Sequence, residues 1–250
     1  MRIDWNTQRT KEHLSIPESY LAKDAVTQNR RELTFLLQEA AFAQRIPIYC
    51  VIDVDLLAEE EKQLFACDEF TSHAAILLGL PIQEMLLFME QTVPELNGSR
   101  IDSMAQLRVK TYLLDYADKL EQQGYQTRKI FPDVLPDHTY ARMLALSKKG
   151  FVGKNGRFVT EDYSSKMCIG ILLTDAPLMG GDYRYPDYLG NGCGDCRACI
   201  DACPAGALAE DGFDRSKCVA YRNEPGNQLQ IAKHSVMKCM KCMEVCLRGK

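Results

Sequence analysis

The sequence has no long apolar run, although 46% of its 250 residues are hydrophobic. No stretch approaches the roughly 18 uncharged apolar residues of a membrane-spanning helix. The first residues, Met1-Arg-Ile-Asp-Trp-Asn-Thr-Gln-Arg9, contain no apolar segment of the kind found in signal peptides. These absences predict a cytoplasmic protein with no membrane contact and enough hydrophobic residues for a sizeable core.

A strong charge imbalance is also missing, because the net charge is −4 and the isoelectric point is near 5.7. This balance argues against a protein dominated by nucleic-acid binding, so an RNA partner would need a local basic patch. Three basic pairs are candidates, and such pairs are more typical of a solvated surface: Arg30-Arg31, Arg128-Lys129 and Lys148-Lys149. The four histidines make no metal-ligand spacing.

Cysteine, by contrast, is concentrated, with eight of 11 residues between Cys193 and Cys246. The first run, Cys193-Gly-Asp-Cys196-Arg-Ala-Cys199-Ile-Asp-Ala-Cys203-Pro204, has the C-x2-C-x2-C-x3-C-P spacing of bacterial ferredoxins. Cys218 follows alone, and the second run is Cys239-Met-Lys-Cys242-Met-Glu-Val-Cys246. Eight thiolates in this arrangement predict two [4Fe–4S] clusters and a protein that transfers electrons.

The ferredoxin rule also predicts how the ligands are shared, because the fourth cysteine of each run serves the other cluster. One cluster is then held by Cys193, Cys196, Cys199 and Cys246, and the other by Cys203, Cys218, Cys239 and Cys242. A disulfide scaffold would need an oxidising compartment, and a zinc site favours separated C-x2-C pairs or mixtures with histidine. Unligated structural thiols at this density are not expected. Cys50, Cys67 and Cys168 lie in apolar stretches and are interpreted as core residues.

Residues 1–185 alternate between helical and strand-like patterns. The apolar spacing predicts helices at 29–45, 56–66, 101–123 and 137–149, and strands at 48–54, 73–80, 125–131 and 166–174. Gly124 is expected to cap the third helix and Gly150 the fourth. A loop-like stretch at 180–192 then leads to the cysteines. The expected fold is an α/β domain, residues 1–185, followed by a ferredoxin-like two-cluster domain, residues 186–250.

The glycine-rich segment Gly150-Phe-Val-Gly153-Lys154-Asn155-Gly156 is neither a Walker A loop nor a G-x-G-x-x-G motif. It is compatible with a helix cap and turn, or with a backbone and lysine clasp on a cofactor. Asp137 begins the preceding helix. Its position suits an N-cap, and an acid near a redox cofactor could also donate a proton.

Several segments together resemble the epoxyqueuosine reductases and, more distantly, the reductive dehalogenases. They are, in chain order, Ala74-Ala-Ile-Leu-Leu-Gly-Leu-Pro81, Tyr112 to Gly124, Gly150-Phe-Val-Gly-Lys-Asn155, Leu172-Leu-Thr-Asp-Ala-Pro-Leu178, the first cysteine run and Cys218-Val-Ala-Tyr221. The resemblance is specific over about residues 70–250. The chain departs from the family at Leu247, where proline usually follows the last cysteine, and in its acid-containing segment.

The resemblance implies a nitroreductase-like α/β domain that binds cobalamin and receives electrons from the clusters. It assigns Gly150, Gly153, Lys154 and Asn155 to cofactor contact, with Asp137 as the nearest proton donor and Asp133 as the second. It also implies tRNA as a substrate and an electron donor such as a ferredoxin or flavodoxin. The leading interpretation is therefore a reductase. The alternatives are a ferredoxin-like electron carrier or redox partner without chemistry of its own, and a redox or oxygen sensor with labile clusters.

Overall fold

The computed structural model describes residues 25–82, 88–93, 98–131, 139–180, 192–232, 235–237 and 239–246. They form two compact units. The first comprises the described residues within Met1–Leu78, Thr111–Ile130 and Gly170–Gly181, and the second those within Gly79–Lys110, Phe131–Ile169 and Asp182–Lys250. The boundary predicted between 185 and 186 lies outside the described residues and stays a prediction.

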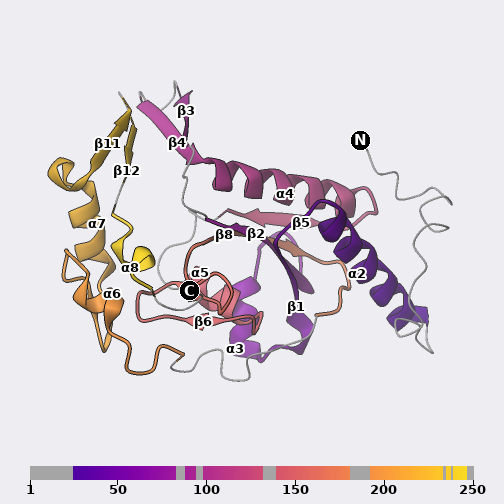
Figure 1. The fold of residues 1–250 in the computed structure, drawn as a ribbon. Helices are drawn as coiled ribbons and strands as arrows, with labels where there is room; N and C mark the ends of the chain where they lie inside the picture. Colours follow the sequence, from indigo (N-terminus) through magenta and orange to yellow (C-terminus); the bar gives the residue numbers. More distant parts are fainter. Residues whose placement is uncertain are drawn as a thin grey trace. The chain divides into compact units, whose positions relative to one another are not determined.

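The first unit is built on a four-stranded sheet with the order β1-β2-β8-β5 (Figure 1). Its strands are β1 (Ile48–Asp53), β2 (Ala74–Pro81), β8 (Met167–Thr174) and β5 (Thr127–Ile130). Strands β2 and β8 are interior, and their apolar runs are buried at nearly every position, as expected for strands covered on both faces. Strand β5 pairs antiparallel with β8. The four predicted strands are confirmed.

Two long helices accompany this sheet, α2 (Ala25–Ala43) and α4 (Met104–Glu121). They contact each other where the hydroxyl of the fully buried Tyr116 donates a 2.9 Å hydrogen bond to the carbonyl of Leu37. Helix α4 ends as predicted, because Gly124 has φ of 88° and the next amide, of Tyr125, donates to the carbonyl of Leu120 at 3.1 Å. Only a residue without Cβ adopts that conformation at little cost.

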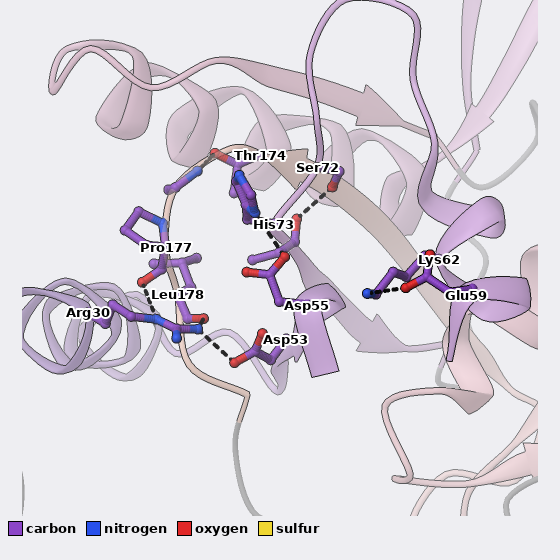
Figure 2. A network of polar contacts seen from close by, with 12 residues as sticks. Arg30, Asp53, Asp55, Glu59, Lys62, Ser72, His73, Thr174, Pro177 and Leu178 are labelled. Atoms are coloured by element: carbon purple, nitrogen blue, oxygen red, sulfur yellow. Dashed lines mark hydrogen bonds and ion pairs between the residues drawn. The ribbon is translucent and has the colours of Figure 1, made fainter. Parts of the chain in front are cut away.

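Helix α2 also holds the chain that follows β8 (Figure 2). The Arg30 guanidinium donates to the carbonyls of Pro177 and Leu178, at 3.3 and 3.0 Å, and pairs with Asp53 at 2.8 Å. Asp53 is buried at the end of β1, and that burial raises the pKa of its carboxyl despite the nearby arginine. The segment quoted for the family resemblance, 172–178, is therefore tied to α2 and β1 through one side chain.

Three predicted helices differ from the structure. Residues 54–65 form three short turns, η2 (Val54–Leu56), α3 (Glu59–Lys62) and η3 (Gln63–Phe65), because they bury too few apolar side chains to stabilise a continuous helix. Residues 101–103 belong to strand β4 (Gly98–Ser103), which pairs with β3 (Phe88–Val93). Helix α5 (Thr139–Ala145) ends well before Gly150, and the left-handed conformation beyond its end is taken by Lys148, with φ of 55°.

The second unit contains short elements, most of them hairpins. Besides β3–β4 and α5, these are β6 (Phe151–Val152) with β7 (Phe158–Val159), α6 (Ala198–Asp201), β9 (Leu208–Ala209) with β10 (Gly212–Phe213), α7 (Arg215–Asn223), η5 (Pro225–Asn227), β11 (Leu229–Ala232) with β12 (Ser235–Met237), and α8 (Lys241–Glu244). All of the described cysteines of the two runs lie in this unit, as does the glycine-rich segment.

Candidate iron–sulfur site

The two cysteine runs meet because the short helices that carry them pack together. Cys199 lies on α6 and Cys242 on α8, and these helices are in contact. The turn before α6 closes when the amide of Cys196 donates to the carbonyl of Cys193 at 3.1 Å. Gly194 makes that turn possible, since its φ of 54° lies in the left-handed region. The C-x2-C spacing thus directs neighbouring sulfurs toward one side of a tight turn.

The electrostatic neighbours of three thiols show which cysteines of the two runs lie near one another. Burial, followed by the thiols of Cys193, Cys242, Cys246 and Cys196, raises the pKa of Cys199 to about 11. Burial raises the pKa of Cys218 and of Cys242 as well, and the thiols that add to it are Cys203 and Cys239 for both. Cys242 and Cys246 of the second run thus lie near Cys199 of the first run, and Cys203 of the first run lies near Cys218 and Cys242.

Cys242 is a neighbour of Cys199 as well as of Cys218, so these neighbours bring the two runs together without assigning each thiol to one cluster, and the two ligand sets stay a prediction. Thiols with raised pKa values remain protonated near neutral pH until a metal displaces the proton. The described residues contain no group of three or more His, Cys, Asp or Glu side chains placed to hold a single metal ion. All 11 cysteines are free thiols in this structure.

A backbone donor and two cations lie near the thiols of Cys203, Cys218 and Cys242. The amide of Ala207 donates to the sulfur of Cys203 at 3.4 Å, an interaction of the kind that tunes cluster potentials. The guanidinium groups of Arg222 and Arg157 counteract the rise in the pKa of Cys218, and Arg157 acts in the same direction on Cys242. Cys218 itself is carried by α7, which begins where the carboxylate of Asp214 accepts from the amide of Lys217 at 3.1 Å.

The glycine-rich segment forms the β6–β7 hairpin, and its glycines are needed for packing within that hairpin. A Cβ on Gly150 would overlap the carbonyl of Val159, and one on Gly153 would overlap the Val159 side chain and Asn155 Oδ1. The amide of Gly153 donates to the carbonyl of Arg157 at 2.8 Å, which closes the turn. Neither glycine is a helix cap. Their predicted role in cofactor contact stays a prediction.

Lys154 and Asn155, at the tip of this hairpin, reach the cysteine runs. Lys154 Nζ donates to the carbonyl of Cys196 at 3.2 Å and pairs with Glu210 at 2.7 Å. The Asn155 side chain is buried, and its Nδ2 donates to the carbonyl of Cys242 at 3.4 Å and to Ser165 Oγ at 3.3 Å. The hydrogen bond between Lys154 and Glu210 raises the pKa of the lysine and lowers that of the glutamate, so both are charged near neutral pH.

The two predicted proton donors, Asp133 and Asp137, lie outside the described residues. Sequence reasoning missed Arg157, which acts on Cys218 and Cys242 by charge, Glu210, which pairs with Lys154 and Arg197, and Asp214, which caps α7. Asp214 had a readable signal, because it stands at an N-cap distance before a helical stretch. Glu210 and Arg157 had none, since each acts on residues distant in the sequence.

Some residues of the basic pairs considered as RNA contacts form ion pairs with carboxylates of this chain. Arg128 pairs with Glu69 at 2.8 Å and Lys129 with Glu121 at 3.3 Å. Arg30 is directed into the network of Figure 2. None of the helices that the structure describes is long and apolar enough to cross a membrane.

The fold and the thiol arrangement define a double-cluster iron–sulfur protein. Residues 192–248 match the family model described as a 4Fe-4S double cluster binding domain. Beyond this segment, the resemblance to the epoxyqueuosine reductases is confirmed. The chain is 35% identical over 103 residues to the epoxyqueuosine reductase of Lactococcus garvieae and 33% identical over 126 residues to that of Leadbetterella byssophila. These alignments cover 39% and 47% of this chain, but only 28% and 39% of the two relatives.

Solved structures of the same kind share the fold. The epoxyqueuosine reductase of Streptococcus thermophilus superposes with a TM-score of 0.55 and 19% identity, over 87% of this chain and 66% of that one. An epoxyqueuosine reductase with a tRNA-Tyr epoxyqueuosine-modified stem loop superposes with a TM-score of 0.53 and 18% identity, over 88% of this chain and 66% of that one. A reductive dehalogenase structure that suggests a mechanism for B12-dependent dehalogenation superposes with a TM-score of 0.52 and 16% identity, over 72% of this chain and 26% of that one. The predicted fold class, α/β with a ferredoxin-like cluster segment, is confirmed.

Proposed function

We propose that this protein is an iron–sulfur oxidoreductase of the epoxyqueuosine reductase type, in which two [4Fe–4S] clusters relay electrons to a reaction centre. The observation that carries the proposal is the match of residues 192–248 to a 4Fe-4S double cluster binding domain, in which thiols of both cysteine runs lie near one another. Cluster binding fits this site chemically. Each predicted ligand set offers four thiols, and backbone amides and cations near them can stabilise the negative charge of a bound cluster.

The proposed ligands are Cys193, Cys196, Cys199 and Cys246 for one cluster, and Cys203, Cys218, Cys239 and Cys242 for the other. Bound clusters supply one-electron transfer, and the protein supplies thiolates, hydrogen bonds and solvent exclusion. Sharing the runs between clusters keeps the two centres close, because each run then contributes to both.

The proposal is tested by counting metal in protein prepared without oxygen. Two cubanes require about eight irons per chain. We expect that number after reconstitution, with visible absorption that bleaches on reduction. Stoichiometric zinc, or about four irons after full reconstitution, would refute the two-cluster assignment. Cys193→Ser and Cys218→Ser should each impair a different cluster, whereas Cys67→Ser, outside both ligand sets, should leave the iron content unchanged.

The acceptor of the electrons is proposed to be a corrinoid. The support is the fold shared with a structure interpreted in terms of B12-dependent dehalogenation. The proposed contacts remain Gly150, Gly153, Lys154 and Asn155, with Asp137 or Asp133 as proton donor. A bound cobalamin would supply two-electron reduction chemistry. The contacts of the β6–β7 hairpin are internal or directed to the cysteine runs, so no step through a corrin is derived from them.

Cobalamin binding is tested by titrating cluster-loaded protein and following the visible spectrum of the corrin. A saturable spectral change supports the reductase. No change at micromolar protein would favour the second candidate, an electron carrier or redox partner without chemistry of its own. The specific observation in favour of that candidate is that the described glycines of 150–153 have their Cβ positions filled by the hairpin itself.

The substrate of the reductase is proposed to be a modified nucleoside in tRNA, by analogy with the relative solved with a tRNA stem loop. The electron donor is proposed to be a ferredoxin or flavodoxin. A cytoplasmic location is proposed because thiols destined for clusters persist in reducing compartments, and all 11 cysteines are free here. Cluster reduction by a reduced flavodoxin, measured anaerobically, tests the donor. Retention of a modified stem loop in a binding assay tests the substrate.

A further inference from the structure

Two consecutive residues of the β6–β7 turn contact different cysteine runs. Lys154 donates to the carbonyl of Cys196, in the first run, at 3.2 Å. Asn155 donates to the carbonyl of Cys242, in the second run, at 3.4 Å. Because the two residues are adjacent in the chain, this single turn fixes the distance between the two runs.

The turn is rigid enough to act in this way. The carboxamide Oδ1 of Asn155 accepts from the amide of Arg157 at 3.1 Å, while the amides of Gly153 and Gly156 make 2.8 Å bonds across the turn. Asn155 is 5% exposed and also donates to Ser165. Its side chain therefore has little freedom to leave the carbonyl of Cys242.

The neighbouring backbone is fitted to the same hairpin. A Cβ on Gly192, the residue before the first ligand, would overlap the ring of Phe151 in β6. The first run thus enters its turn in direct contact with β6. This contact and the Lys154 hydrogen bond hold the run at both ends of the Cys193–Cys196 turn.

Charge at the turn is concentrated on the side of the first run. The side chain of Lys154 is only 15% exposed, and its partner Glu210 also pairs with Arg197. A cluster becomes more negative by one unit when it is reduced. A cation nearby stabilises the reduced form and raises the reduction potential, and an anion does the opposite.

We propose that Lys154 and Asn155 are positioning residues that hold one cysteine run each, and that the Lys154–Glu210 pair sets the reduction potential of the cluster bound by Cys193, Cys196, Cys199 and Cys246. The inference rests on the proposed function, because it presupposes two clusters. It gives the glycine-rich segment a role toward the clusters in addition to the cofactor contact that the family resemblance implies.

The charge part is tested by potentiometric titration of both clusters in the loaded protein, with their signals assigned through Cys193→Ser and Cys218→Ser. Lys154→Met should disfavour reduction of the first cluster about tenfold, which is about 59 mV for a one-electron couple. Lys154→Arg should restore most of the shift. Glu210→Gln should move the same potential in the opposite direction. The second cluster should change less in all three variants.

The positioning part is tested with Asn155→Asp. This substitution keeps an acceptor for the amide of Arg157 and removes the donor to Cys242. The second cluster should be lost to a chelator several-fold faster, with the first cluster retained longer. Gln228→Glu is the matched control, since Gln228 Nε2 donates to the carbonyl of Arg222 at 2.8 Å, which is not a ligand residue. That variant should lose its clusters at the wild-type rate.

Lys129→Met is the control for the charge change, because Lys129 also pairs with a glutamate but belongs to the first unit, whereas the cysteine runs belong to the second. Equal potentials in wild type, Lys154→Met and Glu210→Gln would overturn the inference while leaving two loaded clusters intact. Equal shifts in Lys154→Met and Lys154→Arg would overturn the role of charge. If Lys154→Met alone fails to load iron, the positioning role of Lys154 is supported. The effect of charge on the reduction potential is then decided by the shift measured in Glu210→Gln. Wild-type protein with fewer than two clusters would overturn the proposed function itself.

Discussion

The sheet region and the cysteine segment achieve their order in different ways. The sheet and its helices bury large apolar side chains completely, among them Leu172 in β8 and Leu113 in α4. Among residues 192–228 and 239–246, the buried apolar residues are Cys199, Ala207, Leu208 and Met243. At about 25 cal/mol per Å² of apolar surface removed from water, the sheet gains most of the hydrophobic stabilisation.

The difference indicates what each region needs in order to fold. A segment of about 55 residues with so small a core is seldom stable without a metal or a disulfide. Its helices α6 and α8 are four residues each, too short to persist without tertiary support. Cluster ligation can supply that support, because the free energy of metal binding is coupled to folding. The sheet region has no such requirement.

The largest expected effect is therefore the loss of iron. Anaerobic chelation should unfold the cysteine segment and leave the sheet folded. Hydrogen exchange should show amides of α6 and α7 exposed after chelation, with those of β2 and β8 still protected. Equal protection of the cysteine segment with and without iron would show that its apolar contacts suffice, and the contrast between the regions would disappear.

A cavity in the sheet tests the opposite side of the comparison. Leu172→Ala should lower the free energy of unfolding of the sheet region by about 2–5 kcal/mol, since it deletes a fully buried side chain. The loss should be similar with and without iron, as measured by urea denaturation. Leu114→Ala is the control, because Leu114 is 52% exposed and its truncation should change stability by less than about 0.5 kcal/mol.

The sequence predicted the sheet well because its signals are local. Continuous apolar runs identified β2 and β8, and Gly124 identified the end of α4. The misses came where tertiary context decides the structure. Residues 101–103 read as the start of a helix, and they pair instead with β3. The apolar spacing of 56–66 suggested a helix, but only Phe65 among those residues is buried.

The candidate site was predictable where the spacing of residues in the sequence specifies the group that they bind. The cysteine runs predicted two clusters and their shared ligands. The glycine-rich segment was predicted as a helix cap and turn or, from the family resemblance, as a cofactor contact, while its described contacts run from Lys154 and Asn155 to the cysteine runs. That partner could not be read from the sequence, since 42 positions separate Lys154 from Cys196. The same holds for Asn155 and Cys242, which are 87 positions apart.

A smaller effect is expected from the hydrogen bond between α4 and α2. Tyr116→Phe should cost about 1 kcal/mol, because the buried carbonyl of Leu37 loses its side-chain donor while the ring still fills the core. The change should appear in the sheet transition alone. Tyr125→Phe, at a residue outside the buried core, serves as the control. A loss above about 3 kcal/mol would mean that the ring itself has moved.

The smallest effect concerns the cap of α7, the helix that presents Cys218. The hydroxyl of Ser216 and the amide of Lys217 lower the pKa of Asp214, so its carboxylate is charged at every pH well above about 4. The stabilisation from a carboxylate with a lowered pKa is complete above its unfolded pKa and is lost only as the pH falls through the folded value. Asp214→Ala should therefore speed iron loss to a chelator by the same modest factor at pH 6.5 and at pH 8. Asp214→Asn, which keeps a capping acceptor, should lie close to wild type. A factor that vanishes at pH 6.5 would mean that Asp214 is already protonated there and does not act as a charged cap.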